Sequence, residues 1–219
     1  MTILVGPDPD SKALWLHDVL AMHESRFIEE AWHKMQDTDE DRVIHLPTHD
    51  AEHFELFLLF AYTRSIYSSK AGDLSDGTVD LEWVRLVQAW ALGDHLQADD
   101  FEDAIMDALL EKINHTRRPL PPMLHRVIYF HAAANTPLRR LAVDIAAWRW
   151  DNEFLKAQKT DGAWRGSEAW SDFFMDLALT LNETKKERQS GKPPFEGDTC
   201  AYHEHRLTGA PCYKSKFRF

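Results

Sequence analysis

The stretch VIHLPTHDAEHFELFLLFAYTRSIY, residues 43–67, decides which class of fold this chain can adopt. Its first residues alternate in character and end at Pro47, which lacks a backbone donor, so they predict a short strand over residues 42–47. Asp50 then predicts a helix N-cap, because its carboxylate can accept free N–H groups of the first turn. Apolar residues follow at the spacing of one helix face, namely Phe54, Phe57, Leu58 and Ala61. A strand that leads directly into an apolar helix indicates a mixed α and β domain.

The flanking residues extend this pattern. Upstream, Thr2–Val5 and the residues from Ala13 predict two short strands, and the second runs into a helical segment that is interrupted at Ser25. Downstream, apolar periodicity predicts helices over residues 81–92, 99–113, 123–131, 137–148 and 167–181. Asp99 and Thr136 are predicted N-caps, the first in a capping box with Glu102. The predicted fold class is therefore α+β, a small sheet with a helical cluster followed by a helical C-terminal extension.

Composition divides the chain into three parts. The sequence RRPLPP (117–122) breaks the helices and predicts a boundary between a domain of residues 1–115 and a helical extension of residues 120–183. Residues 184–219 show no helical period and are predicted to form a mostly irregular basic tail. This tail carries eight Lys or Arg against four Asp or Glu, a net charge of +4, whereas residues 1–183 carry −15. The tail can therefore fold back on the acidic body.

Charge and hydropathy exclude several classes of partner. The chain has 25 Lys or Arg and 36 Asp or Glu, a net charge of −11, and nucleic-acid affinity needs clustered Lys and Arg. No apolar run approaches the ~18 residues of a membrane span, and the start MTILVGPDPD lacks the features of a signal peptide. With only two cysteines, we expect an intracellular protein of the cytoplasm or nucleus, without nucleic-acid or membrane partners.

Several segments carry a resemblance to a known family. In WLHDVLAMHESRFIEEAW (15–32) a His precedes a helix and Ser-x-Phe follows, and in residues 43–67 a strand ends in Leu-Pro and a helix in Ala-Tyr-Thr-Arg-x-Ile. Further motifs are LVQAWALGDHLQADDFEDAIMDAL (86–109), NTPLRRLAVD (135–144) and the Cys- and His-containing tail. Together with the order strand, strand, helices, strand and helical array, they resemble the BTB/POZ domain, in particular its fungal versions. The resemblance covers nearly the whole chain, although each motif alone is degenerate.

The resemblance implies a non-enzymatic protein–protein interaction module. BTB/POZ domains pair with themselves or act as adaptors, and some bring substrates to cullin-type ubiquitin ligases, so protein partners are expected and a cullin is one candidate. Dimeric members usually carry Lys or Arg after the helix-leading His, paired with an Asp in an early strand. Here that position is Asp18, no such Asp is present, and the chain starts almost on the first strand. Homodimerisation of the family type therefore stays open.

One local pattern suggests chemistry instead. The sequence HDAEH (49–53) fits the H-x-x-E-H pattern of some zinc peptidases, in which two histidines one helical turn apart bind zinc beside a catalytic Glu. His49 precedes the predicted cap Asp50, so His49 and His53 would not share a regular turn. We interpret the pattern as the polar first turn of a helix. No nucleophile, base and orienting acid can be combined from the sequence, so no catalytic residues are predicted.

The tail contains the best candidate for a metal site. Four soft ligands lie within thirteen positions, namely Cys200, His203, His205 and Cys212. Zinc binds such residues tetrahedrally, and four protein ligands would make the site structural rather than catalytic. The spacing C-x2-H-x-H-x6-C is not a common zinc-finger pattern, and the two histidines would point the same way only in an extended segment. Residues 209–211, Gly-Ala-Pro, are predicted to turn the chain toward the second cysteine.

Three states of these four residues stay open. In the first, they bind no metal and pack against the body, with Tyr202 as the anchor of the tail and the two histidines hydrogen-bonded at its docking surface. In the second, they hold a structural zinc ion. In the third, the two cysteines form a disulfide, which a reducing compartment disfavours.

Overall fold

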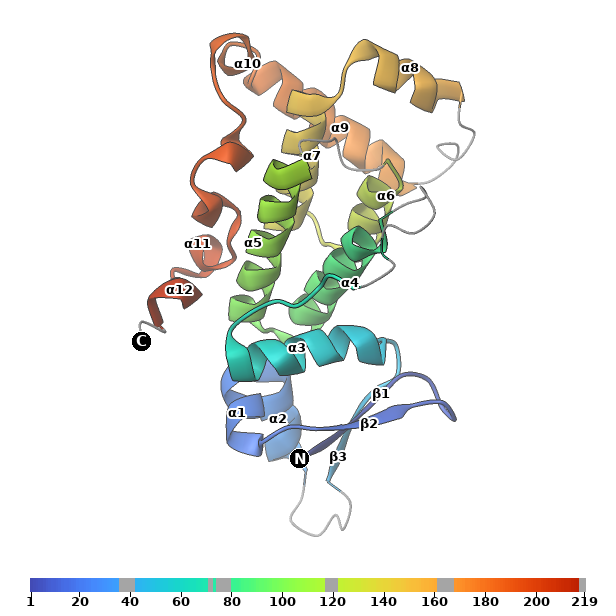
Figure 1. The fold of residues 1–219 in the computed structure, drawn as a ribbon, viewed down its shortest axis with the longest axis vertical. Coiled ribbons are helices and arrows are strands. Elements are labelled where there is room, and N and C mark those ends of the chain that lie inside the picture. Colours follow the sequence, from blue (N-terminus) through green and yellow to red (C-terminus); the bar gives the residue numbers. More distant parts are fainter. Residues whose placement is uncertain (36–41, 71–72, 74–79, 117–121, 161–167, 217–219) are drawn as a thin grey trace.

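The computed structural model shows an α+β protein with a small sheet at one end and the helices of a C-terminal extension at the other (Figure 1). The structure describes residues 1–35, 42–70, 73, 80–116, 122–160 and 168–216. Among these residues, no helix combines the length and the apolar composition that crossing a membrane requires.

Three short strands form a mixed sheet in the order β2-β1-β3. Strand β1 (Thr2–Val5) pairs antiparallel with β2 (Lys12–Trp15) and parallel with β3 (Val43–Leu46). Alternate residues face the core, as the two-residue period of a strand requires, and the buried ones are Ile3, Val5, Ile44 and Leu46. The three predicted strands are confirmed, β1 with the predicted bounds and the other two with ends shifted by one residue.

Ser25 separates two helices, as the interrupted pattern predicted. Helix α1 (Asp18–Glu24) ends at Ser25, and α2 (Arg26–Lys34) begins after it. The hydroxyl oxygen of Ser25 accepts the N–H of Ile28 at 3.1 Å, which caps α2. The same hydroxyl donates to the carbonyl of Leu96 at 2.7 Å. One buried side chain therefore both starts α2 and joins it to the core.

Helices α3 (Ala51–Thr63), α4 (Leu81–Leu96) and α5 (Asp99–Thr116) form the centre of the core. Asp50 caps α3 as predicted, because its Oδ1 accepts the N–H of Glu52 at 2.8 Å. The rings of Phe57 and Phe60 contact Phe101 of α5, with centroids 5.4 Å and 5.5 Å apart. These tilted aromatic contacts fix α3 against α5.

The start of α5 differs from the prediction. Asp99 is the first residue of the helix rather than its N-cap, since the carbonyl of Ala98 already accepts the N–H of Glu102 at 3.0 Å. Gln97, with a φ of 50°, ends α4 in the left-handed conformation and leaves a very short connection. Glu102 is buried beside Gly93, where a Cβ atom would lie only 2.6 Å from Glu102 Cγ. Glycine at this position lets α4 and α5 approach closely.

The extension packs directly on this core. Its helices are α6 (Pro122–His131), α7 (Pro137–Arg149), α8 (Asn152–Thr160) and α9 (Glu168–Glu183). Helix α6 lies against α4, and α9 lies across α6 and α7 (Figure 1). The predicted boundary at RRPLPP falls almost wholly on residues 117–121, outside the described residues, as does the predicted start at residue 167. Thr136 precedes α7 as predicted, but its hydroxyl bonds back to Ala133 and does not cap the helix.

The prediction of a mostly irregular tail was wrong. Residues 187–216 form a series of short turns of helix, namely α10 (Glu187–Ser190), η2 (Pro194–Glu196), η3 (Thr199–Tyr202), α11 (His205–Thr208) and α12 (Tyr213–Lys216). They descend along α5 toward the N-terminal end of that helix (Figure 1). Phe195 and Tyr202 are fully buried. The tail is held by single aromatic anchors within these short turns, and such isolated anchors leave no helical period in the sequence.

Candidate metal centre

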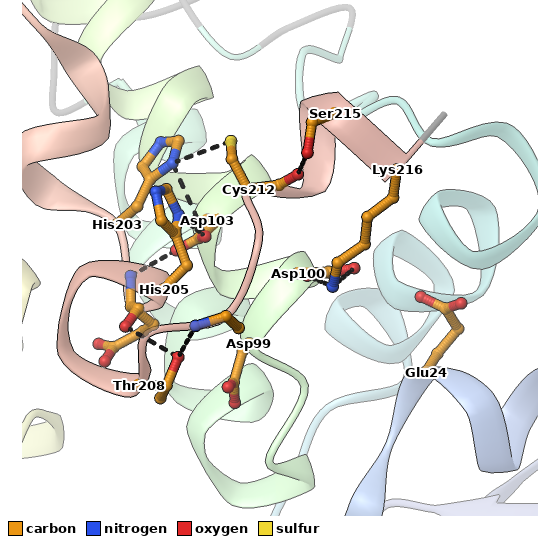
Figure 2. Close-up of polar contacts among 12 residues, drawn as sticks. Glu24, Asp99, Asp100, Asp103, His203, His205, Thr208, Cys212, Ser215 and Lys216 are labelled. Atoms are coloured by element: carbon orange, nitrogen blue, oxygen red, sulfur yellow. Dashed lines mark hydrogen bonds and ion pairs between the residues drawn. The ribbon is translucent and has the colours of Figure 1, made fainter. Parts of the chain in front are cut away.

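Helix α5 offers two carboxylates to the tail. Asp103 and Asp107 are one helical turn apart, so both lie on the side of α5 that the tail covers. Asp103 is almost completely buried, and Asp107 is partly exposed. Figure 2 shows Asp103 directly beside the rings of His203 and His205.

Local hydrogen bonds and one left-handed residue shape the tail at this place. Asp198 caps η3, since its Oδ1 accepts the N–H of Cys200 at 3.0 Å. Gly209 adopts a φ of 74°, which ends α11 and turns the chain toward Cys212, as the Gly-Ala-Pro sequence predicted. Tyr202 is buried and its hydroxyl donates to Asp144 of α7 at 2.7 Å. Tyr202 is the anchor that the sequence predicts in the first of its three open states, packing without metal, and this anchor is observed.

His203 and His205 meet for a different reason from the one predicted. His203 has an extended backbone, but Glu204 is helical and His205 opens α11. The chain therefore turns between the two histidines, and their ring centroids come within 5.1 Å. An extended segment is not needed, because the first turn of α11 brings the second ring back over the first.

The structure brings all four predicted ligands together, and we refer to Cys200, His203, His205 and Cys212 as the Cys/His cluster. One ligand atom of each residue lies within 4.8 Å of all the others. The two sulfur atoms are 3.9 Å apart. Cys212 Sγ is also 3.9 Å from His203 Nδ1, a contact that Figure 2 shows. Both cysteines are free thiols. The disulfide, one of the three states left open by the sequence, is therefore not the state of this structure.

Each histidine of the cluster also faces a carboxylate of α5. His205 Nδ1 lies 2.8 Å from Asp103 Oδ2, within hydrogen-bond distance. His203 Nε2 lies 3.1 Å from Asp107 Oδ1, close enough for an ion pair but without hydrogen-bond geometry. The ring of His203 is fully buried. The other nitrogen of each ring is left as its possible metal ligand.

The two carboxylates differ in how their surroundings affect them. Burial raises the pKa of Asp103, and contacts with His205 and His203 oppose that rise only in part. Burial also favours the neutral form of Asp107, but contacts with His203, Lys214 and Tyr213 outweigh it and lower its pKa to about 2. Lys214 Nζ lies 2.8 Å from Asp107. The basic tail therefore does fold back on acidic side chains of the body.

The H-x-x-E-H pattern does not build a peptidase site. His49 lies before the N-cap Asp50 and only His53 lies within α3, as the sequence predicted. Glu52, which would have to be the catalytic base, is engaged by Arg85 and by Lys70. His49 instead contacts the ring of His95, at a centroid distance of 4.7 Å. In the described part of the chain, the pattern is the polar first turn of a core helix.

His49 gives a testable dependence of stability on pH. Burial, followed by the charges of His95, His53 and His131, lowers the pKa of His49 from 6.5 to about 4. The unfolded chain binds this proton near pH 6.5, so the stabilisation is complete above that pH and is lost progressively as the pH falls to about 4. Because the side chain is partly exposed, we expect a loss of about 1–2 kcal/mol.

Urea unfolding at about pH 7 and at about pH 5 measures this loss when wild type and His49→Gln are compared. The variant is expected to lose less stability than wild type between the two pH values, since it has no proton to bind. His33→Gln, which changes an exposed histidine of α2, is the matched control. Equal losses in wild type and in His49→Gln would contradict the role given to His49.

A second group of acidic side chains is already neutralised by basic ones. Asp73, Asp80 and Glu82 come close enough together to share a metal ion. However, Arg85 pairs with Asp73 at 3.0 Å, and Lys112 pairs with both Asp80 and Glu82. We interpret this group as an ion-pair network.

Sequence reasoning singled out the four candidate ligands but missed their surroundings. It assigned no role to Asp103, Asp107 or Asp144, although all three hold the tail. One signal could have found two of them: Asp103 and Asp107 repeat with the period of α5 amid its apolar positions. Two acidic residues on the apolar side of a helix need partners, and the basic tail supplies them.

The fold and the site together define an α+β protein in which a cluster of soft ligands lies where the C-terminal tail covers α5. No protein-family model matches the sequence, and no curated protein matches it. The functional argument therefore starts from the residues and the fold.

Proposed function

We propose that this protein is a non-enzymatic protein–protein interaction module of the BTB/POZ type. The observation that carries the proposal is the order of elements in residues 2–116. A strand pair, a helix pair, a third strand parallel to the first and three core helices follow one another in the order that the resemblance predicted. The segments that carry the resemblance also pack together, since α3 contacts α1, α4 and α5.

A group of exposed apolar side chains supports an interaction role. Trp15 is 70% exposed, Val19 is 77% exposed and Tyr62 is 48% exposed. Trp15 and Val19 flank His17 in the sequence, and Tyr62 contacts it, since the hydroxyl of Tyr62 lies 2.5 Å from His17 Nδ1. Single exposed apolar residues are ordinary, but neighbouring ones that include two aromatic rings are typical of protein interfaces. We call Trp15, Val19 and Tyr62 the Trp15 surface.

Self-association and cullin binding are the two forms of this function that the chain can be tested for directly. The sequence gives less support to a homodimer. Asp18, which is exposed at the start of α1, occupies the position where dimeric BTB/POZ domains usually carry Lys or Arg. The cullin adaptor is favoured by the helical extension, because α6 packs on α4 and makes one continuous body with the domain.

The experiment is a binding comparison with the purified full chain. Light scattering on a sizing column detects a dimer, and sedimentation with a cullin N-terminal domain at tens of micromolar detects the adaptor. Trp15→Arg is expected to weaken the observed association at least about tenfold, because truncated or charged interface anchors cost that much. Phe130→Arg, which changes an equally exposed aromatic residue of α6, is the matched control and should bind like wild type.

Two results would contradict the proposal. In the first, the purified chain stays monomeric and does not bind the cullin domain, and protein partners from its native source bind Trp15→Arg and wild type equally. The other is metal-dependent hydrolysis of a peptide that disappears in His53→Ala, since that would restore the peptidase interpretation of residues 49–53.

A further inference from the structure

We propose that the Cys/His cluster binds one structural zinc ion, which fastens the C-terminal tail to helix α5. This inference does not rest on the BTB/POZ assignment. It rests on the geometry of the four ligands, on the carboxylates behind them, and on the place of the cluster in the fold.

Two separations between ligand atoms are close to those of a tetrahedral zinc site. With Zn–S bonds of about 2.3 Å and Zn–N bonds of about 2.0–2.1 Å, tetrahedral angles place two sulfurs about 3.8 Å apart and a sulfur and a nitrogen about 3.6 Å apart. The observed separations are 3.9 Å between the sulfurs and 3.9 Å between Cys212 Sγ and His203 Nδ1. No pair of ligand atoms is farther apart than 4.8 Å.

The carboxylates of α5 complete the pattern of a zinc site. Histidines that bind zinc almost always present their second ring nitrogen to a carboxylate or a carbonyl, which fixes the ring and strengthens the ligand. Here Asp103 stands behind His205 Nδ1 at 2.8 Å, and Asp107 stands behind His203 Nε2 at 3.1 Å. His203 Nδ1 also approaches Asp103, but at 3.7 Å, beyond a hydrogen bond. The nitrogens left for the ion are therefore Nε2 of His205 and Nδ1 of His203.

The buried ring of His203 leaves one of its nitrogens for a metal ion. Its side chain is fully buried, and its Nε2 faces Asp107 Oδ1 at 3.1 Å without hydrogen-bond geometry. An ion on Nδ1 would fix the tautomer that carries the proton on Nε2, beside the carboxylate of Asp107.

The ligand types select zinc among the common metals. Two thiols and two imidazoles in tetrahedral positions suit Zn²⁺, whereas Ca²⁺ and Mg²⁺ require oxygen ligands. On binding, the two thiols lose their protons to solvent, so two thiolates balance the two charges of the ion. Because the protein provides all four ligands, no position is open for a reactive water molecule. The ion would have a structural role only.

The position of the cluster shows what the ion would hold. Its ligands lie on both sides of the turn at Gly209. Through Asp103 and Asp107, the same ion is connected to the middle of α5. A bound ion would therefore close the loop of residues 200–212 and fix it to the helix at the same time.

Metal analysis of the full chain tests the inference. Protein purified without chelator and with a thiol reductant is expected to contain one zinc ion per chain, and Cys212→Ser is expected to contain less than about a tenth of that. His23→Gln, which alters an exposed histidine on α1, should retain the metal. After removal of zinc, added Co²⁺ should give the absorption bands of tetrahedral thiolate coordination in wild type and in His23→Gln only.

The outer carboxylates provide a second test. Asp107→Asn is expected to weaken zinc binding by about 10- to 100-fold in a competition with a chelator, without loss of any ligand. Asp100→Asn, which removes only the exposed ion pair with Lys216, is the control and should leave the affinity unchanged. Circular dichroism must show that each variant is folded. Limited proteolysis should cleave the wild-type tail after Arg206 at least about tenfold faster once zinc is removed.

The following results would overturn the inference. Each is a result for folded wild-type protein: it contains less than about a tenth of an equivalent of zinc and gives no cobalt spectrum, it binds zinc no better than Cys212→Ser, or it carries a Cys200–Cys212 disulfide under reducing conditions. The first result would mean that the tail packs on α5 without metal, and the second that an adventitious ion binds elsewhere. The third would mean that a disulfide, and not a metal ion, joins the two cysteines.

Discussion

Replacement of Arg85 by methionine is expected to lower the free energy of unfolding by about 3–5 kcal/mol, the usual cost of removing one partner from a buried ion pair. Arg85 is only 8% exposed in helix α4. Its guanidinium donates to both carboxylate oxygens of Asp73, at 3.0 Å and 3.1 Å, and to the carbonyl of Ser68 at 2.5 Å. It also donates to Glu52 of α3. Methionine preserves the length of the side chain but removes the donor of Ser68 and of Asp73 Oδ1, while Lys70 still donates to Glu52 and to Asp73 Oδ2.

The geometry of the network explains why the loss should be large. The side chain of Asp73 is nearly as buried as that of Arg85, so water cannot easily replace the missing donor. The hydrogen bond from Arg85 is also the main cause that lowers the pKa of Asp73. Arg85→Lys should recover only part of the loss, because an ammonium group cannot serve four acceptors with the planar geometry of a guanidinium.

Urea unfolding of wild type, Arg85→Met and Lys70→Met gives the comparison. Lys70 is half exposed and pairs with the same Glu52, so its replacement should cost no more than about 1 kcal/mol. A cost below about 1 kcal/mol for Arg85→Met would show that solvent reaches these acceptors and that the network does not hold α3, α4 and residue 73 together.

The comparison of sequence and structure shows which interactions can be predicted locally. Asp50 and Ser25 marked the starts of α3 and α2 correctly, because a cap bonds to N–H groups only two or three residues away. The three strands were also found, since the apolar alternation of a strand is a local pattern. Asp99 was misassigned as an N-cap because α5 already begins at this residue. The left-handed conformation of Gln97 makes this short connection possible, and the sequence gives no sign of it, since glycine is the residue that usually marks such a conformation.

The tail could not be predicted in the same way. Glu204 and His205 bond to Asp103 across about a hundred residues, and no periodicity connects positions so far apart. The opposite charges of tail and body correctly suggested that the two meet, but charge is too long-ranged and too diffuse to select α5. The residue types indicated the four candidate ligands. Their convergence depends on the turns at η3 and Gly209, which only the folded chain shows.

Replacement of Tyr202 by alanine is expected to remove about 3–5 kcal/mol from the attachment of the tail, the cost of deleting a large buried aromatic side chain. Tyr202 is completely buried, and its ring lies under the guanidinium of Arg140 at 4.9 Å. Its hydroxyl donates to Asp144 Oδ2 at 2.7 Å. The side chain thus joins the tail to α7, whereas the carboxylates that face the Cys/His cluster belong to α5.

Because the tail contacts the body through separated anchors, the variant should open locally before it unfolds globally. Hydrogen exchange in chelator, so that metal does not contribute, should therefore accelerate in residues 195–216 far more than in α3 or α4. Tyr202→Phe retains the ring and should lose only about 1–3 kcal/mol, the cost of leaving the buried Asp144 without its donor. Leu207→Ala, which shortens an exposed side chain of α11, should exchange like wild type. Uniform acceleration of exchange across the whole chain in Tyr202→Ala would instead show that the tail and the body unfold as one cooperative unit. The tail would then have no separate opening for a bound metal ion to prevent.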